Sequence, residues 1–106
     1  MKVYSESSPI RGHIYRWKSR NEKVVLVPTM GHLHKGHVSL IELAKSLGQR
    51  VVVSIFVNPL QFNNESDFSR YPRTLTSDIE QLLALDVDAV FTPSTESLYP
   101  HGIQSA

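Results

Sequence analysis

The sequence predicts an α/β protein in which a parallel sheet of about four strands carries helices on both faces. Short runs of β-branched residues alternate along the sequence with amphipathic helical patterns. The runs are apolar at nearly every position, as expected for strands that are covered on both faces rather than exposed to solvent on one. The helical crossovers are long enough to join parallel strands, which makes the sheet doubly wound. The 106 residues suit a single domain, expected to span residues 1–106.

Four apolar runs are expected to form the strands. They occupy residues 1–4, 23–28, 51–59 and 88–93. The three longer runs end in proline, at Pro28, Pro59 and Pro93. Proline has no N–H for a sheet ladder, so each of these prolines is expected to mark the end of strand pairing.

The first helix is expected within residues 8–21. Pro9 suits a first helical position, and Ile10, Ile14 and Trp17 recur at helical spacing, so they are expected to face the core. His13 is expected on the surface of this helix.

Two further helices are expected within residues 36–48 and 76–86. In the first of these, Gly48 is expected to cap the C-terminus, and a wide apolar stripe is expected to face the core. The stripe consists of Val38, Ile41, Ala44 and Leu47, widened by Leu40 and Leu43. In the second, Ser77 and Glu80 have the spacing of a capping box. The residues expected to face inward there are Ile79, Leu82 and Leu83.

Composition and charge exclude several classes of protein. Lysine and arginine (11) nearly balance aspartate and glutamate (10), and the basic first helix lacks interleaved aromatic residues, which argues against nucleic-acid binding. Without cysteine, disulfide frameworks, thiolate metal sites and cysteine nucleophiles are excluded, and a reducing compartment is favoured. The apolar runs are too short for a membrane span and the first residues do not resemble a signal peptide, so a soluble, cytoplasmic protein is expected.

The stretch VPTMGHLHKGHVSL, residues 27–40, places three histidines in six positions where a strand passes into a helix. Ligands of doubly wound sheets bind beyond the carboxyl ends of the strands, and a helix N-terminus offers unpaired N–H groups that suit phosphate. His34 and His37 are expected on one face, where both can donate to one phosphate. Gly31 and Gly36 allow a ligand close to the backbone. We interpret the stretch as a nucleotide phosphate site.

Two other interpretations of this stretch stay open. His32, His34 and His37 have the spacing of metal ligands, and three histidines can hold zinc. The positive end of the helix and the lack of an acidic residue within the stretch disfavour a cation, so no metal is expected. The stretch can also be a plain capped turn.

The connection over residues 58–76 is longer than ordinary loops, which indicates a functional segment. Its apolar residues Leu60, Phe62, Phe68 and Tyr71 are expected to anchor it.

His34, Gly36 and His37 resemble the HxGH signature of the nucleotidyltransferase superfamily. The wider strings VPTMGHLHKGHVSLIELAK, VVVSIFVNPLQFNNESDFSRYPRTL and VFTPSTESLYPHG resemble the pantothenate synthetase family, from Val24 to Gly102. The resemblance implies a Rossmann-like fold and the N-terminal, nucleotide- and pantoate-binding half of the family. The lysine- and aspartate-bearing segment and the serine-serine-arginine loop, with which family members close over ATP, do not occur in this sequence.

The resemblance implies an ATP-dependent ligase that condenses pantoate with β-alanine through a pantoyl adenylate, releasing AMP and pyrophosphate. It further implies Mg²⁺ with the ATP phosphates and a homodimer built through this half. The 106 residues alone are expected to lack turnover. The alternatives are another nucleotidyltransferase sharing only HxGH, which the string NPLQF disfavours, and a non-catalytic nucleotide-binding domain.

The resemblance also implies roles for particular residues. His37 would be the proton donor, and His34 would act beside it as charge builds at the α-phosphate. Gln61 would bind pantoate near β-alanine. The other ATP contacts would be Met30, Gly31, His32, Leu33, Lys35 and Gly36, and the other substrate contacts Asn58, Pro28 and Thr29. For Arg70, Tyr71 and Arg73, substrate binding and dimer contacts are equally open.

Overall fold

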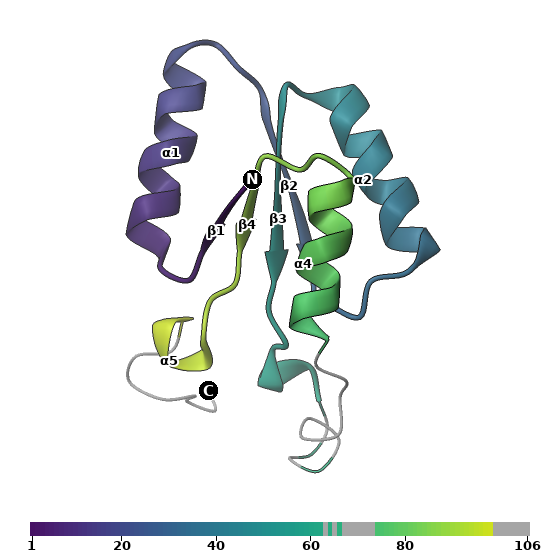
Figure 1. Ribbon diagram of the computed structural model, residues 1–106. Coiled ribbons are helices and arrows are strands. Elements are labelled where there is room, and N and C mark those ends of the chain that lie inside the picture. Colours follow the sequence, from purple (N-terminus) through teal and green to yellow (C-terminus); the bar gives the residue numbers. More distant parts are fainter. Residues whose placement is uncertain (63, 65, 67–73, 99–106) are drawn as a thin grey trace.

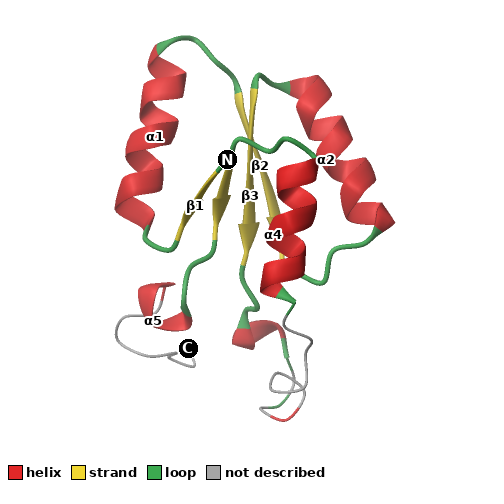
Figure 2. Ribbon diagram, in the orientation of Figure 1, coloured by secondary structure: helices red, strands yellow, loops and turns green. Residues whose placement is uncertain are grey.

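The computed structural model describes residues 1–62, 64, 66 and 74–98, and it has the predicted α/β architecture (Figure 1, Figure 2). The described elements are β1 (Lys2–Tyr4), α1 (Ser7–Ser19), β2 (Val24–Thr29), α2 (Lys35–Leu47), β3 (Arg50–Ile55), the short 3₁₀ helix η1 (Pro59–Gln61), α4 (Leu75–Ala84), β4 (Ala89–Phe91) and α5 (Thr95–Leu98). Among them, no helix has the length and hydropathy needed to cross a membrane.

The sheet has the strand order β1-β4-β3-β2, and every neighbouring pair is parallel. Helices cover both of its faces, as predicted. The larger core cluster joins one face to α2 and α4, and the smaller cluster joins the other face to α1. Helix α1 connects the two edge strands, β1 and β2. The winding therefore reverses at β2, the strand that leads into the histidine stretch.

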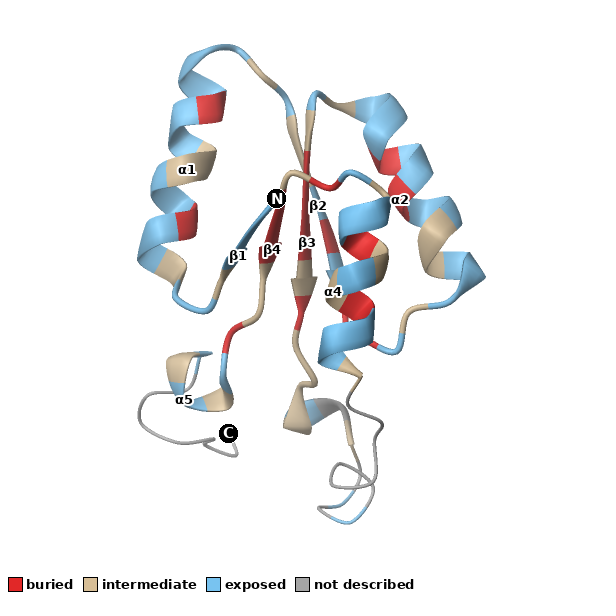
Figure 3. Cartoon of the chain, viewed as in Figure 1, coloured by how far each residue is buried: buried red, intermediate tan, exposed pale blue. Residues whose placement is uncertain are grey.

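Strand β3 shows why the valine runs lack alternation. Val51 and Val53 belong to the cluster under α2 and α4, whereas Val52 belongs to the cluster under α1. All three are at most 2% exposed (Figure 3). A strand covered on both faces is apolar at every position.

The prolines do not mark strand ends as closely as predicted. Pro28 lies inside β2, opposite Ser54 of β3, and the prediction that it ends the strand is wrong. Because β2 is an edge strand, the missing N–H of Pro28 interrupts no ladder within the described residues. Strand β3 ends at Ile55 and β4 at Phe91, each before its proline.

Helices α1 and α4 begin earlier than predicted. Helix α1 starts at Ser7, so Pro9 lies inside its first turn, while Ile10 and Trp17 are buried as predicted. Helix α4 starts at Leu75, and the capping box predicted at Ser77 is wrong.

Two apolar faces are also narrower than predicted. On α4, Leu82 is fully buried, but Leu83 is 60% exposed. Successive residues of a helix point in different directions, so Leu82 faces the sheet and Leu83 faces away from it. On α2, Ile41 and Ala44 are buried. Its remaining leucines, contrary to the prediction, are exposed: Leu40, Leu43 and Leu47.

Gly48 ends α2 as predicted, for a different reason. Its backbone is extended rather than left-handed. A Cβ at Gly48 would lie 2.8 Å from the carbonyl oxygen of Lys23 and 2.7 Å from a methyl group of Val25. The glycine is therefore required by the close approach of the chain to β2.

A polar cluster closes the amino ends of the strands. Arg50 forms ion pairs with Glu22 and Asp88, which raise the pKa of its guanidinium, and it lies over the Trp17 ring. His13, predicted on the helix surface, stacks on Trp17 with ring centroids 4.0 Å apart. The cluster lies at the end of the sheet opposite to the histidine stretch.

Candidate functional site at the carboxyl edge of the sheet

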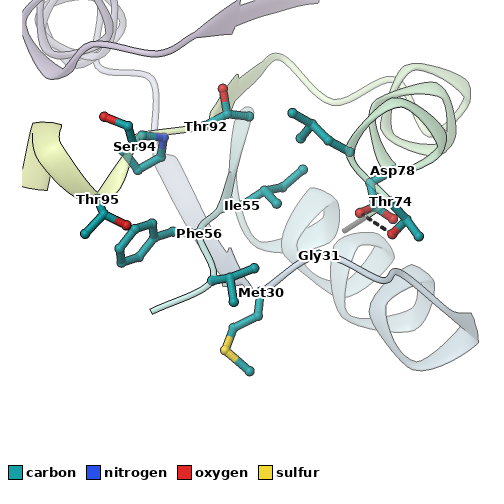
Figure 4. A pocket seen from close by; sticks show the side chains of 12 residues that line it. Met30, Gly31, Ile55, Phe56, Thr74, Asp78, Thr92, Ser94 and Thr95 are labelled. Carbon is teal, nitrogen blue, oxygen red and sulfur yellow. Dashed lines mark hydrogen bonds between the residues drawn. The ribbon is translucent and has the colours of Figure 1, made fainter. Parts of the chain in front are cut away.

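An open cavity of about 640 Å³ lies at the carboxyl ends of β2, β3 and β4. It brings together six of the residues predicted to bind ligands: Pro28, Thr29, Met30, Gly31, His37 and Asn58. A smaller cavity of about 250 Å³ (Figure 4) lies beside it, and Met30 and Gly31 are among the residues that line both cavities. Met30 and Gly31 of the histidine stretch therefore border both cavities, at the edge where ligands of doubly wound sheets bind.

Asp78, from the first turn of α4, holds the loop that precedes α2. Its carboxylate accepts the backbone N–H groups of His32 and Leu33, both at 2.9 Å. It also accepts the hydroxyl of Thr74 at 3.0 Å (Figure 4). The side chain is only 2% exposed. This buried carboxylate thus ties together segments that are 45 and 46 residues apart in the chain.

Sequence reasoning did not identify Asp78. A signal was available, since a helix that follows a parallel strand starts at the carboxyl edge of the sheet. Acidic residues in its first turn therefore lie near the loops of that edge.

Gly31 fits against the same carboxylate. Its φ is 80°, and a Cβ would lie 2.9 Å from Oδ2 of Asp78 and 3.3 Å from a methyl group of Ile55. His32 follows with φ 53°. The glycine is required by the close approach of the Asp78 carboxylate, at which the left-handed turn aims two successive N–H groups.

Thr29 supports the loop from the other side. Its hydroxyl donates to the carbonyl oxygen of Ser54 at 2.9 Å and accepts the N–H of Gly31 at 3.2 Å. The one hydroxyl proton of Thr29 is therefore used within the protein, although its side chain lines the larger cavity.

His34 and His37 cap α2 reciprocally. Nδ1 of His34 accepts the N–H of Gly36 at 3.0 Å, and Nδ1 of His37 accepts the N–H of His34 at 3.2 Å. The ring centroids are 4.2 Å apart, so the predicted proximity of the two imidazoles is confirmed. Because a neutral imidazole that accepts through Nδ1 carries its proton on Nε2, each ring has one Nε2–H donor.

The surroundings of His37 favour its neutral form. Burial lowers the pKa of His37, and the neighbouring His34 and His32 lower it further, while the Asp78 carboxylate opposes them. His37 is half-buried and lines the larger cavity, whereas His34 is exposed. The two rings thus differ in access to solvent although they share one capping arrangement.

The backbone of this loop is less available to an anion than the sequence suggested. The N–H groups of Gly31, His32, Leu33, His34 and Gly36 all donate to side chains of the protein. Donors that a phosphate could still use are the imidazoles of His34 and His37, the ammonium of Lys35, and the N–H groups of Lys35 and His37 in the first turn of α2. Lys35 and His32 are exposed and do not line the larger cavity.

The structure describes only some of the residues of the long connection that were predicted to bind substrate. The Asn58 side chain accepts the N–H of Leu60 at 3.0 Å and lines the larger cavity. Gln61 ends η1, close in sequence to Asn58. Leu60, predicted as an anchor, is 56% exposed. Phe62, also predicted as an anchor, is half-buried. Four further residues predicted there lie outside the described part of the chain: Phe68, Arg70, Tyr71 and Arg73.

Possible metal ligands do not gather at this site. Across residues 1–62, 64, 66 and 74–98, no group of three or more histidine, cysteine or acidic side chains is arranged to hold a metal ion. The three donors directed at Asp78 also occupy its oxygens.

Comparison with known proteins gives consistent matches along the chain. A family model described as pantoate-beta-alanine ligase matches residues 2–106. A pantothenate synthetase of Aliivibrio fischeri is 50% identical over 104 residues, which cover 98% of this chain and 36% of that protein. A pantoate–beta-alanine ligase of Schizosaccharomyces pombe is 48% identical, again over 98% of this chain and 37% of its own length.

Solved structures show the same similarity. A pantothenate synthetase from Thermus thermophilus superposes with a TM-score of 0.87 at 43% identity, over 99% of this chain and 36% of that one. A pantoate-beta-alanine ligase from Francisella tularensis, complexed with beta-gamma ATP and beta-alanine, gives 0.83 at 44% identity, over 100% of this chain and 42% of that one. The chain therefore spans well under half the length of these relatives.

Proposed function

Because the chain belongs to the pantoate-beta-alanine ligase family, we propose that it forms the nucleotide- and pantoate-binding part of an ATP-dependent ligase that joins pantoate to β-alanine. The observation that carries the proposal is the cavity at the carboxyl edge. It gathers Pro28, Met30, Asn58 and His37, from β2, α2 and the segment after β3, around one space. Residues 1–106 act as a single domain in this proposal.

The proposed reaction explains the need for ATP. A carboxylate is a poor electrophile, so pantoate is first activated. One of its carboxylate oxygens attacks the α-phosphorus of ATP, and the bond to pyrophosphate breaks. The amine of β-alanine then attacks the acyl carbon of the pantoyl adenylate, AMP leaves with the electrons of the broken C–O bond, and the nitrogen loses a proton to give the amide.

In this proposal, His34 and His37 stabilise the charge that builds at the α-phosphate. The capping arrangement leaves each ring with an Nε2–H donor, so both can donate while neutral. His37, which lines the cavity, is the proton donor, and His34 donates from the exposed side. Lys35 adds a positive charge beside them.

The opposite side of the cavity is proposed to hold pantoate and β-alanine. Pro28 contributes apolar surface that suits the methyl groups of pantoate, and Asn58 contributes an amide. Gln61, three positions further along η1, is proposed to bind the carboxylate and hydroxyl of pantoate, because an amide both donates and accepts. Thr29 contributes through the hydrogen bonds that support the loop.

Mg²⁺ is proposed to arrive with the ATP phosphates. The described residues do not fit a protein cage for it, because they contain no ligand cluster and the oxygens of Asp78 are occupied by protein donors. A magnesium ion held mainly by phosphate oxygens and water suits such a site.

We also propose that the protein is a homodimer built through this part of the chain. Leu40, Leu43 and Leu47 form one exposed stripe on α2, each at least 45% exposed. Contiguous exposed leucines are typical of contact surfaces. Sedimentation velocity tests this: Leu43→Lys is expected to shift a dimer to monomer, and an unchanged sedimentation coefficient would place the interface elsewhere.

The decisive experiment for the activity is a chimera. Residues 1–106 replace the matching part of the Aliivibrio fischeri pantothenate synthetase, which is 50% identical there. The chimera is expected to form pantothenate and to release pyrophosphate only when ATP and pantoate are both present. A folded chimera that binds neither substrate would contradict the proposed function.

A further inference from the structure

The loop before α2 is held by a residue from another element. Asp78 of α4 receives hydrogen bonds from the N–H groups of His32 and Leu33, and Leu33 leads directly into His34. His34 is the N-cap residue of α2 and donates its own N–H to the ring of His37. The position of both imidazoles therefore depends on where the carboxylate holds the two preceding peptide groups.

The environment of Asp78 is specific for a carboxylate that accepts hydrogen bonds from the loop. A carboxylate buried to 2% exposure is costly unless donors surround it. Three donors do so: the N–H groups of His32 and Leu33 and the hydroxyl of Thr74. Gly31 makes room for Oδ2, since any Cβ there would lie 2.9 Å from it.

The same contact decides where a phosphate can bind. The left-handed turn at Gly31 and His32 points two successive N–H groups in one direction, an arrangement that suits an anion. The carboxylate of Asp78 already occupies that position. The backbone of the turn is therefore not available to a nucleotide phosphate, which leaves the start of α2 with its two imidazoles.

We propose that Asp78 is a positioning residue for the phosphate-binding histidines: it fills the turn at Gly31 and His32 and thereby fixes the reciprocal cap in which His34 and His37 both present Nε2–H. The inference rests on the proposed function for its catalytic meaning. Its structural content, which is the tautomer and orientation of the two rings, can be measured without any ligand.

The test compares Asp78→Asn with a matched control, Asp88→Asn, in the 106-residue chain. Asp88 also accepts a backbone N–H, that of Val51 at 2.8 Å, but at the opposite end of the sheet. Each substitution replaces a carboxylate that holds a backbone amide, so both are expected to lower the melting temperature. Only Asp78→Asn changes hydrogen bonds to the loop that carries the histidines.

The readout is the ¹⁵N NMR signature of the imidazole nitrogens, which distinguishes the two neutral tautomers. The wild-type chain and Asp88→Asn are expected to show both rings in the Nε2–H form. In Asp78→Asn the amide NH₂ faces one of the loop N–H groups, so His34 and His37 are expected to show mixed tautomers. Affinity for ATP is expected to fall about tenfold or more in Asp78→Asn only, as for the loss of hydrogen bonds to a charged group.

A second variant covers the case in which Asp78→Asn does not fold. Gly31→Ala keeps the carboxylate but pushes a methyl group toward it, and it is expected to disturb both imidazole signatures in the same way. Wild-type signatures in a folded Asp78→Asn, or in Gly31→Ala, would overturn the proposal. If the wild-type chain binds no ATP, the proposed function loses support, whereas the tautomer measurement still decides the role of Asp78.

Discussion

The imidazole of His37 accepts the backbone N–H of His34 through Nδ1 at a distance of 3.2 Å. This hydrogen bond makes His37 part of the helix cap, and the same side chain lines the larger cavity. In the proposed function the same side chain caps the helix and donates to phosphate, so the ionisation of His37 would affect both local stability and catalysis.

The first prediction concerns catalysis by His37. In the chimera, His37→Ala is expected to lower kcat by about 10²–10³, because it removes a donor to charge that develops in the transition state. The KM for ATP is expected to change little. Glu42→Gln, on the exposed side of the same helix, is the control and is expected to keep the wild-type kcat. A loss seen purely as weaker ATP binding would remove the catalytic role of His37.

The second prediction concerns pH. Burial and the neighbouring histidines lower the pKa of His37 in the folded chain below its usual 6.5. Above that pH both the folded and the unfolded chain carry neutral His37. As the pH falls, the unfolded chain binds a proton first, so stability declines until the pH has passed the folded pKa.

His37→Asn separates this contribution from that of other groups. The asparagine Oδ1 can accept the His34 N–H in place of Nδ1 but does not titrate. Melting temperatures of the 106-residue chain between pH 8 and 5 are expected to fall less in the variant. Identical pH dependences would show that His37 has the same pKa in both states.

The third prediction concerns metal content. The purified chain is expected to carry no stoichiometric zinc, because both Nδ1 atoms of His34 and His37 are hydrogen-bonded and the positive end of α2 repels a cation. Elemental analysis measures this directly. About one zinc per chain, lost in His32→Ala, would instead indicate a three-histidine site.

The fourth prediction concerns substrate choice. In the chimera, Gln61→Ala is expected to impair the use of pantoate by roughly 1–3 kcal/mol, because a substrate polar group loses its partner. The affinity for ATP is expected to stay nearly unchanged, since Gln61 follows β3 whereas the histidines follow β2. Steady-state kinetics with each substrate varied checks this, and an unchanged KM and kcat for pantoate would place Gln61 outside the site.

The fifth prediction concerns the chain by itself. Its two core clusters cover both faces of the sheet, so it is expected to melt cooperatively. It is not expected to form pantothenate, because adenylate chemistry needs, in addition to the imidazoles and Lys35, groups that exclude water and neutralise phosphate. Incubation with ATP, Mg²⁺, pantoate and β-alanine, followed by a pyrophosphate assay, tests this. Turnover at the rate of full-length relatives would show that residues 1–106 suffice.

The sequence by itself determined the fold class and the candidate loop. Both depend on local patterns: valines at successive positions predict a strand covered on both faces, and the spacing of His34 and His37 places them on one helix turn. Steric and hydrogen-bonding preferences over three or four residues are enough for such inferences. The family resemblance, which is also a property of the sequence, is the source of the proposed substrates.

Only the tertiary structure decided what surrounds that loop. Asp78 meets His32 from 46 residues away, and although its place in the first turn of α4 puts it at the carboxyl edge, no local pattern tells which backbone groups it accepts. Pro28 is tolerated inside β2 because the strand order places β2 at an edge, and Leu83 is exposed because the sheet covers only one side of α4. Such contacts depend on how separate elements pack around a shared core, and local periodicity fixes the faces of each element but not its neighbours.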